Sequence, residues 1–138
     1  KGVTPFDVMG AARQVAVVLE LTTDPELLPV VRRTAGVLAR QLGFPKGQQL
    51  SLQEGVEKAC RQFLQRSGCE GRTLHVVFTG FSDRLEIVVE NEADGTETSE
   101  EESYLLRQLL DRVVVEETEA GKLRLTLVKY RSPEGSAQ

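Results

Sequence analysis

The most chemically distinctive stretch of the sequence is an acidic segment from Glu92 to Glu102. It follows a strand-like alternation over residues 85–89 and precedes a helix predicted to open at Ser103. Where a strand leads through a loop into a helix, free backbone N–H groups and the positive end of the helix dipole favour phosphate. This segment contains no Lys or Arg. Its six carboxylates are Glu92, Asp94, Glu97, Glu100, Glu101 and Glu102. The segment therefore disfavours an anion at the place where nucleotide-binding folds usually hold one.

The other reactive side chains form no recognisable catalytic or metal-binding set. His75 is the only histidine, and no Ser or Cys nucleophile stands at a spacing that would pair with it, so we expect a surface residue. Cys60 and Cys69 are the only cysteines, and their spacing matches no metal or redox motif. We expect two reduced thiols. The acidic segment would attract Mg²⁺ but supplies no positioned ligands, so no metal site is predicted.

Composition and charge exclude several classes of partner. The 138 residues suffice for one domain, and 40% hydrophobic with 28% charged residues is typical of a globular protein. The net charge is −4 and the densest basic spot is Arg32–Arg33, so nucleic acid and anionic membranes are not expected partners. No apolar run reaches the roughly 18 residues of a membrane span, and a cytoplasmic location is expected. The missing initial Met suggests a piece of a longer protein.

Hydrophobic periodicity predicts the elements that must position these residues. The predicted strands cover 14–22, 73–79, 84–90, 114–117 and 122–131, and the predicted helices cover about 27–42, 48–66 and 104–113. Ser51 and Glu54 fit a capping box near the start of the second helix, and the pattern also permits a start one turn earlier. The order of elements predicts an α+β fold: a two-layer sandwich with a mostly antiparallel five-stranded sheet and three helices on one face. Residues 1–12 are predicted to be an extension, 13–131 the domain and 132–138 a polar tail.

The predicted sheet has one apolar face and one mixed face. Leu74, Val76 and Phe78 should face the helices, opposite an equivalent set on the next strand. Alternation places several apolar residues on the opposite face. They are Val18, Val77, Val88, Val128 and Tyr130. Scattered apolar residues on a solvated face are common, and the alternative is a partner or homodimer surface.

Four stretches of the sequence resemble the anti-sigma-factor serine kinases, a branch of the Bergerat-fold (GHKL, histidine-kinase-like) ATPases. They are residues 23–33, which lead into the first helix, 55–62 in the second, 104–113 in the third, and 123–130 in the last strand. The likeness covers about residues 14–131. It implies the histidine-kinase-like ATPase fold, which agrees with the fold expected from periodicity.

The resemblance also shows where the family's chemistry is altered. In the family, the second helix carries a Glu as general base and, four residues later, an Asn that helps to hold Mg²⁺. The matching positions here are Lys58 and Gln62. A protonated Lys cannot accept a proton from a serine hydroxyl, and Gln is one methylene longer than Asn. If Lys58 faces the same cavity as the acidic segment, the two could neutralise each other; a solvated Lys58 is the alternative.

The family's glycine motifs are also replaced. The Asp-x-Gly-x-Gly motif that reads adenine corresponds to residues 91–95, where Asn91 replaces the Asp, Ala93 replaces a Gly and Gly95 remains. The Gly-x-Gly run that wraps the triphosphate corresponds to a Glu-rich stretch that ends at Glu102 and Ser103. There Thr98 with Glu101, or Ser99 with Glu102, fits a capping box in which the chain's own carboxylates would occupy the helix N-terminus.

The resemblance therefore predicts a nucleotide pocket that has lost most of its chemistry. We call its residues the predicted nucleotide pocket: Lys58, Gln62, Asn91, Ala93, Gly95, Glu102 and Ser103. No catalytic residue and no cofactor are expected. The implied function is regulation by contact with a sigma factor or an anti-anti-sigma-like domain. Two alternatives remain open: an active ATP- and Mg²⁺-dependent protein serine kinase with an unusual pocket, and a structural dimerisation module.

Overall fold

The computed structural model describes residues 13–22, 24–65, 73–94, 100–117 and 122–132; side chains at 13, 91–94, 100–102 and 122 are outside the description. The chain forms, in order, β1 (Arg13–Thr22), the 3-10 helix η1 (Pro25–Leu27), α2 (Leu28–Gln41), α3 (Lys46–Leu64), β2 (Thr73–Phe81), β3 (Arg84–Asp94), α4 (Glu100–Leu109), β4 (Arg112–Glu117) and β5 (Lys122–Tyr130).

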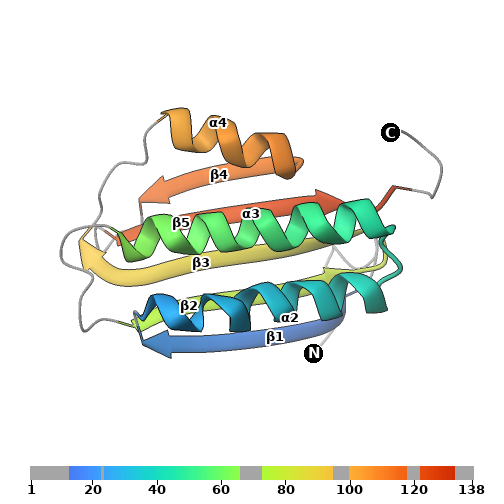
Figure 1. The fold of residues 1–138 in the computed structure, drawn as a ribbon, viewed down its shortest axis with the longest axis horizontal. Coiled ribbons are helices and arrows are strands. Elements are labelled where there is room, and N and C mark those ends of the chain that lie inside the picture. Colours follow the sequence, from blue (N-terminus) through green and yellow to red (C-terminus); the bar gives the residue numbers. More distant parts are fainter. Residues whose placement is uncertain (1–12, 23, 66–72, 95–99, 118–121, 133–138) are drawn as a thin grey trace, which may run out of the picture.

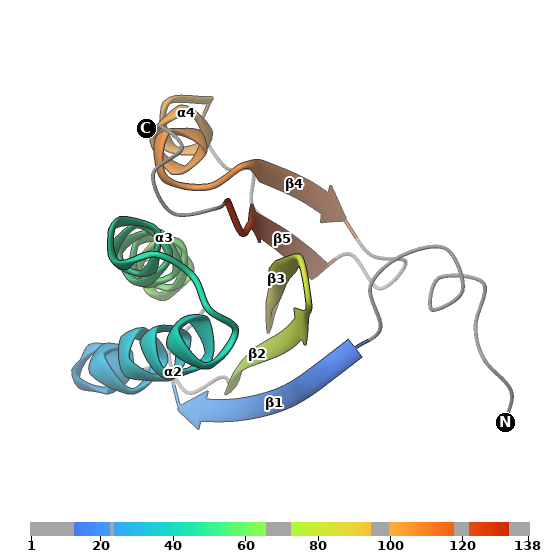
Figure 2. The same cartoon turned by 90° about the vertical axis from the view of Figure 1, so that its right-hand side faces the viewer.

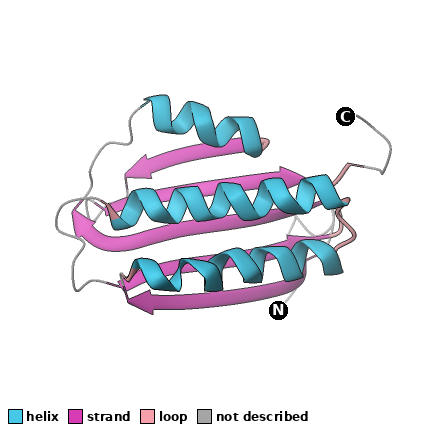
Figure 3. Cartoon of the chain, viewed as in Figure 1, coloured by secondary structure: helices cyan, strands magenta, loops and turns pink. Residues whose placement is uncertain are grey.

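The described residues form two layers. All strand pairs are antiparallel, and the sheet order is β1-β2-β3-β5-β4. The three α-helices lie on one face of this sheet, with α3 in the middle (Figures 1 and 3). Figure 2, turned by 90°, shows the helix layer on one side and the curved sheet on the other. The predicted two-layer α+β sandwich is therefore confirmed.

The core lies between the two layers, as the alternation predicted. Leu74, Val76 and Phe78 of β2 are fully buried against the helices, as are Leu85, Ile87 and Val89 of β3. The strand register pairs Val76 with Val89 and Phe78 with Ile87. The buried stripe of α3 covers these strands. It consists of Leu52, Val56, Ala59, Cys60 and Phe63.

Local signals explain where α2 and α3 begin and end. The Asp24 carboxylate accepts a hydrogen bond from the Glu26 N–H at 3.0 Å and caps η1, which leads into α2. Gly43 follows α2 with a φ of 87°, a left-handed conformation that favours glycine. The capping box predicted for Ser51 and Glu54 is wrong: α3 begins at Lys46, so Ser51 lies inside the helix.

The third helix is displaced from its predicted position. It begins at Glu100 and ends at Leu109, rather than running from 104 to 113. Val113 belongs to β4, where it pairs with Leu127 and is buried. The switch occurs at Asp111, whose N–H donates to the Val128 carbonyl at 2.9 Å and whose carboxylate accepts from the Tyr130 N–H at 2.6 Å. These bonds to β5 begin the strand ladder before the helix can continue.

The predicted acidic loop is shorter than expected. Residues 91–94 continue β3, with a register shift between Glu90 and Asp94, and residues 100–102 form the start of α4. Residues 95–99, with Gly95 and the first residues of both predicted capping boxes, lie outside the described part of the chain. The fold thus brings the acidic segment to the end of β3 and the beginning of α4.

Candidate functional site

The elements of the predicted nucleotide pocket meet at one end of the molecule. The last turns of α3, the end of β3 and the first turn of α4 all lie on the left in Figure 1. Lys58 and Gln62 are one turn apart on α3, and Asn91 pairs with Leu74 near the end of β3. The side chains of Asn91, Ala93 and Glu102 are outside the description, so the structure places only their backbone positions.

Lys58, which is predicted to stand at the kinases' general-base position, is half-buried. No ion pair of Lys58 is found among the described residues, so its predicted neutralisation by the acidic segment stays a prediction. An ordinary Lys is protonated at neutral pH and donates hydrogen bonds rather than accepting a proton. The predicted position thus holds a lysine instead of a carboxylate.

The neighbouring carboxylate, Glu57, is bound by two arginines. One of its oxygens accepts from Arg32 of α2 at 2.8 Å, and the other accepts from Arg61 of α3 at 2.8 Å. Burial opposes ionisation of Glu57, but the hydrogen bonds and charges of Arg32 and Arg61 outweigh it, so the pKa of this carboxyl lies below its ordinary value. A carboxylate held in this way is a weak base, and it joins two helices.

Gln62 carries a buried acceptor that is not satisfied. Its Oε1 atom is buried and has no hydrogen-bond partner among the described residues. Leaving a buried acceptor unpaired costs about 1–3 kcal/mol. Across from α3, Ser103 lies buried in the first turns of α4. Among the described side chains of the predicted pocket, Gln62 is therefore the one whose buried oxygen could bind a hydrogen-bond donor or a cation of a ligand.

The beginning of α4 is occupied by acidic residues. Glu100, Glu101 and Glu102 are its first three residues. Carboxylates near a helix N-terminus interact favourably with the helix dipole and repel an incoming anion. The helix is held in place because its Leu106 and the following Leu110 belong to the core. A Cβ at Gly55 of α3 would lie 3.0 Å from Leu110, so the two segments are in close contact.

Among the described residues, the Cys60 thiol lies in the core and the His75 imidazole lies on the outer face of the sheet. Cys60 is fully buried, and burial, with a smaller effect of the Glu57 charge, raises the pKa of its thiol to about 12. His75 is half-exposed between the buried residues Leu74 and Val76, with its Nε2 atom 3.7 Å from Glu20. A protonated thiol in the core is inert. Cys69 lies outside the described residues.

The outer face of the sheet carries a narrow row of valines. The register aligns Val18, Val77 and Val88 across β1, β2 and β3, and Val18 is 64% exposed. Tyr130 is also exposed. Val128 lies on this face but is only 5% exposed, so it adds almost no accessible surface and the predicted partner surface is corrected there.

A charged row limits this valine row on one side. Register places Glu20, His75, Glu90, Arg124 and Glu116 next to one another across the five strands. Arg124 forms ion pairs with Glu90 and, at 3.6 Å, with Glu116. The charged row therefore bounds the valine row on that side, whereas large exposed apolar patches are what usually mark partner surfaces.

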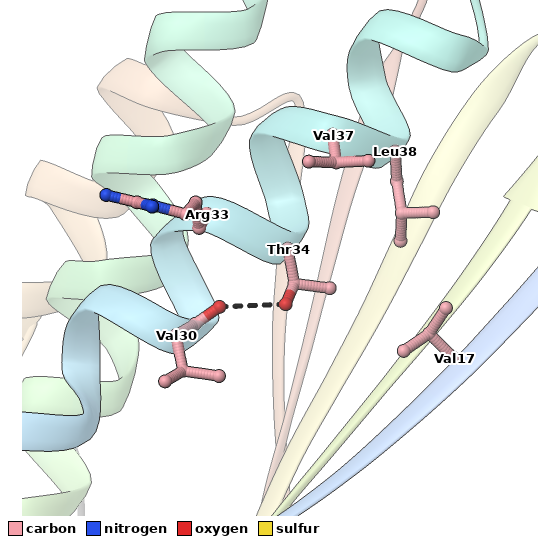
Figure 4. Close-up of a pocket in the computed structure, with 6 residues that line it drawn as sticks. All are labelled: Val17, Val30, Arg33, Thr34, Val37 and Leu38. Carbon is pink, nitrogen blue, oxygen red and sulfur yellow. Dashed lines mark hydrogen bonds between the residues drawn. The ribbon is translucent and has the colours of Figure 1, made fainter.

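Sequence reasoning missed an apolar groove between β1 and α2. Its volume is about 410 Å³, and its lining residues are Val17, Val30, Arg33, Thr34, Val37 and Leu38. We call it the β1–α2 groove (Figure 4). Val30 and Val37 are two turns apart on α2, a spacing visible in the sequence. The spacing alone did not predict a groove, because the groove depends on the position of α2 over β1.

Comparisons with known proteins identify no family for this chain. No family model matches the sequence, and no curated protein matches it. In the described part of the chain, no helix combines the length and apolar character needed to cross a bilayer. Nor do the described residues contain a group of three or more His, Cys, Asp or Glu side chains that could hold a metal ion.

Proposed function

We propose that this chain is a regulatory protein-interaction domain related to the anti-sigma-factor serine kinases, with weak or lost ATP binding. It would act by contact with a sigma factor or an anti-anti-sigma-like domain. The observation that carries the proposal is the pair Glu57 and Lys58 on α3. Glu57 is a bound carboxylate with a lowered pKa, and Lys58 is a lysine at the position where the related kinases would hold their Glu.

The proton-transfer argument is direct. Transfer of phosphate to a serine requires a group that accepts the hydroxyl proton near neutral pH. Lys58 replaces the carboxylate that the related kinases use, and Glu57 already has both oxygens engaged by Arg32 and Arg61. The thiol of Cys60 is protonated and buried. These side chains supply no general base on this part of α3.

The charge at α4 supports the same proposal. A triphosphate placed at the helix N-terminus would approach the first residues of α4, which are three glutamates. Each like-charge contact costs about 1 kcal/mol at 4 Å in water and more where water is excluded. A domain with this charge would keep its fold for contact with a protein while losing affinity for the nucleotide.

The active-kinase alternative is favoured by one observation. The unsatisfied Oε1 atom of Gln62 is the kind of oxygen that Mg²⁺, or water bound to it, would satisfy. The residues around it fit the ion poorly, because Lys58 lies one turn away on the same helix. The structural alternative, dimerisation through the outer face, is favoured by the exposed Val18 and the valine row.

Calorimetric titration of the full chain with Mg-ATP tests the proposal. We expect a dissociation constant weaker than about 1 mM. Micromolar affinity would overturn the proposal. A matched pair of variants then locates any binding, because Gln62→Ala removes the buried acceptor whereas Gln65→Ala changes an exposed glutamine beyond the end of α3. Binding lost only in Gln62→Ala would place the nucleotide beside Gln62 and favour the active-kinase alternative.

The partner is tested separately. Purified sigma factors and anti-anti-sigma-like domains would be mixed with the full chain and analysed by gel filtration, with and without Mg-ATP. The proposal expects a complex that forms equally well in both conditions. A complex that requires Mg-ATP, or no complex with either class of protein, would contradict it.

A further inference from the structure

Two buried apolar side chains lie outside the core. Among the described residues, every other buried apolar side chain belongs to the core between the helices and the sheet, whereas Phe81 and Val128 do not. Phe81 is 6% exposed and Val128 is 5% exposed. Strand alternation places both on the outer face, because Phe78 of β2 and Leu127 of β5 face the helices. The helix layer therefore does not cause their burial.

A cation is buried at the same place. Arg84 lies on the outer face of β3, and its side chain is only 12% exposed. Its guanidinium carbon lies 3.9 Å from the centroid of the Phe81 ring, and its Nε atom binds Glu86 at 2.8 Å. The register pairs Glu86 with Val128 on the neighbouring strand. We call Phe81, Arg84 and Val128 the outer-face patch.

The strands themselves do not account for this burial. Val88 lies on β3 in the middle of the sheet and Val77 lies beside it, yet both are only half-buried. Val128 lies on β5, nearer to an edge, and is less exposed than either. The three described α-helices all lie on the other face of the sheet (Figure 2). The described elements thus leave the patch without a cover.

Position along the chain indicates which segment covers the patch. Phe81 pairs with Arg13 at the start of β1, so residues 1–12 join the fold beside the patch. The longer internal segments outside the description join elements at the opposite end of the strands: 66–72, 95–99 and 118–121. The carboxyl-terminal residues follow Ser132, whose N–H donates to Gln48 of α3 at 3.1 Å, on the helix side of the sheet.

We propose that the amino-terminal segment, residues 1–12, folds back over the outer-face patch of its own chain. The path from β1 to β5 crosses three strand spacings, about 14–15 Å, which about four or five extended residues span. Phe6, Val8 and Met9 stand four to seven residues before Arg13, so they reach the patch. They supply the apolar surface that Phe81 and Val128 need in order to be buried.

The patch makes few polar demands on this cover. Arg84 is already paired with Glu86 and, at 2.9 Å, with Asp83, so an apolar cover leaves no unpaired charge beneath it. The covered patch lies at one end of the outer face, and Val18 of the valine row remains 64% exposed. The segment therefore limits the part of this face that a partner can reach. The proposal is independent of ATP binding and of the partner proposed above.

Tryptophan fluorescence tests the contact, because the chain contains no Trp. In the full chain, we expect Phe6→Trp to show blue-shifted emission and weak quenching by iodide. Val18→Trp is the matched control, because Val18 is exposed on the same face of the sheet, and its emission should be red-shifted and strongly quenched. Both substitutions lie outside the core, so the domain should still fold. Equal quenching of the two variants would overturn the proposal.

A nitroxide spin label locates the contact. In a Cys69→Ser chain, Met9→Cys supplies the labelling site, because Cys60 is buried. We expect the label to broaden the methyl signals of Val128 more than those of Val37, which lines the β1–α2 groove. Equal or stronger broadening of Val37 would overturn the proposal, as would sharp Val128 signals. Broadening of Val128 in an isotope-enriched chain by the label on a second copy would equally reject a contact within one chain.

Discussion

Glu57 ties α2 to α3 because its two oxygens are divided between Arg32 and Arg61. Glu57→Gln keeps the shape of the side chain and removes its charge. We expect the free energy of unfolding near pH 7 to fall by roughly 0.5–1 kcal/mol, the range for partly exposed pairs. Urea denaturation measures the change. Glu54→Gln, at an exposed position on the same helix, serves as the control and should cost less.

The pH dependence of that change has a defined sign. The pKa of Glu57 is lowered from 4.5 in the folded chain, so the folded state favours the charged form. The stabilisation is therefore complete above the unfolded pKa and is lost as the pH falls through the lowered folded value. The difference between the native chain and Glu57→Gln should close in acid. A difference that persists there would contradict this account of Glu57.

Cys60 should be chemically silent in the folded chain. Burial raises the pKa of its thiol to about 12, so the folded state favours the protonated thiol. The contribution of this preference to the free energy of unfolding is complete below the unfolded pKa of 9.0 and declines above it. In a Cys69→Ser chain, we expect no reaction with a thiol reagent at about pH 8 until the protein is unfolded. Rapid labelling of the folded chain would contradict the burial.

Lys58 tests the predicted balance between α3 and the acidic segment. If Lys58 offsets the carboxylates at the end of β3 and the start of α4, Lys58→Glu adds negative charge there and should lower the melting temperature. Lys46→Glu, at an exposed position in the first turn of the same helix, is the control for a charge change as such. Equal melting temperatures for the native chain and Lys58→Glu would mean that Lys58 is merely solvated.

At the scale of elements, replacing either of two glycines near the α2–α3 connection by alanine should change the free energy of unfolding in opposite directions. Gly43 has a φ of 87°, so Gly43→Ala strains the backbone and should lower the free energy of unfolding by about 1 kcal/mol. Gly47 lies in the first turn of α3 with nothing within 4 Å of a new Cβ, so Gly47→Ala should raise it by up to about 1 kcal/mol. Thermal unfolding of the two variants compares them directly, and a shift in the same direction for both would refute the interpretation.

Element order was predictable from the sequence, whereas some boundaries were not. Alternation over β2 and β3 identifies Val76 and Ile87 as buried because strand periodicity is local. The predicted end of the third helix at Val113 is wrong because the spacing of Leu106, Leu110 and Val113 continues a helical pattern. Only the hydrogen bonds of Asp111 to β5 end the helix and begin β4.

At the scale of the whole molecule, the candidate sites differ in how much of each could be predicted from the sequence. The order of elements was enough to bring Lys58, Gln62 and Ser103 to one end, because α3, β3 and α4 must pack side by side. The contact of Arg32 with Glu57 joins residues 25 positions apart and needs the packing of α2 on α3. The β1–α2 groove likewise exists only once the helix lies over an edge strand.

The two edges of the sheet differ in their tendency to aggregate. β4, at one edge, is six residues long and carries Arg112, Glu116 and Glu117, and charges of this kind oppose the addition of a further strand. β1, at the other edge, is ten residues long, and Glu20 is the only charged residue after its first position. Strand addition between chains at high concentration should therefore begin at β1 and not at β4.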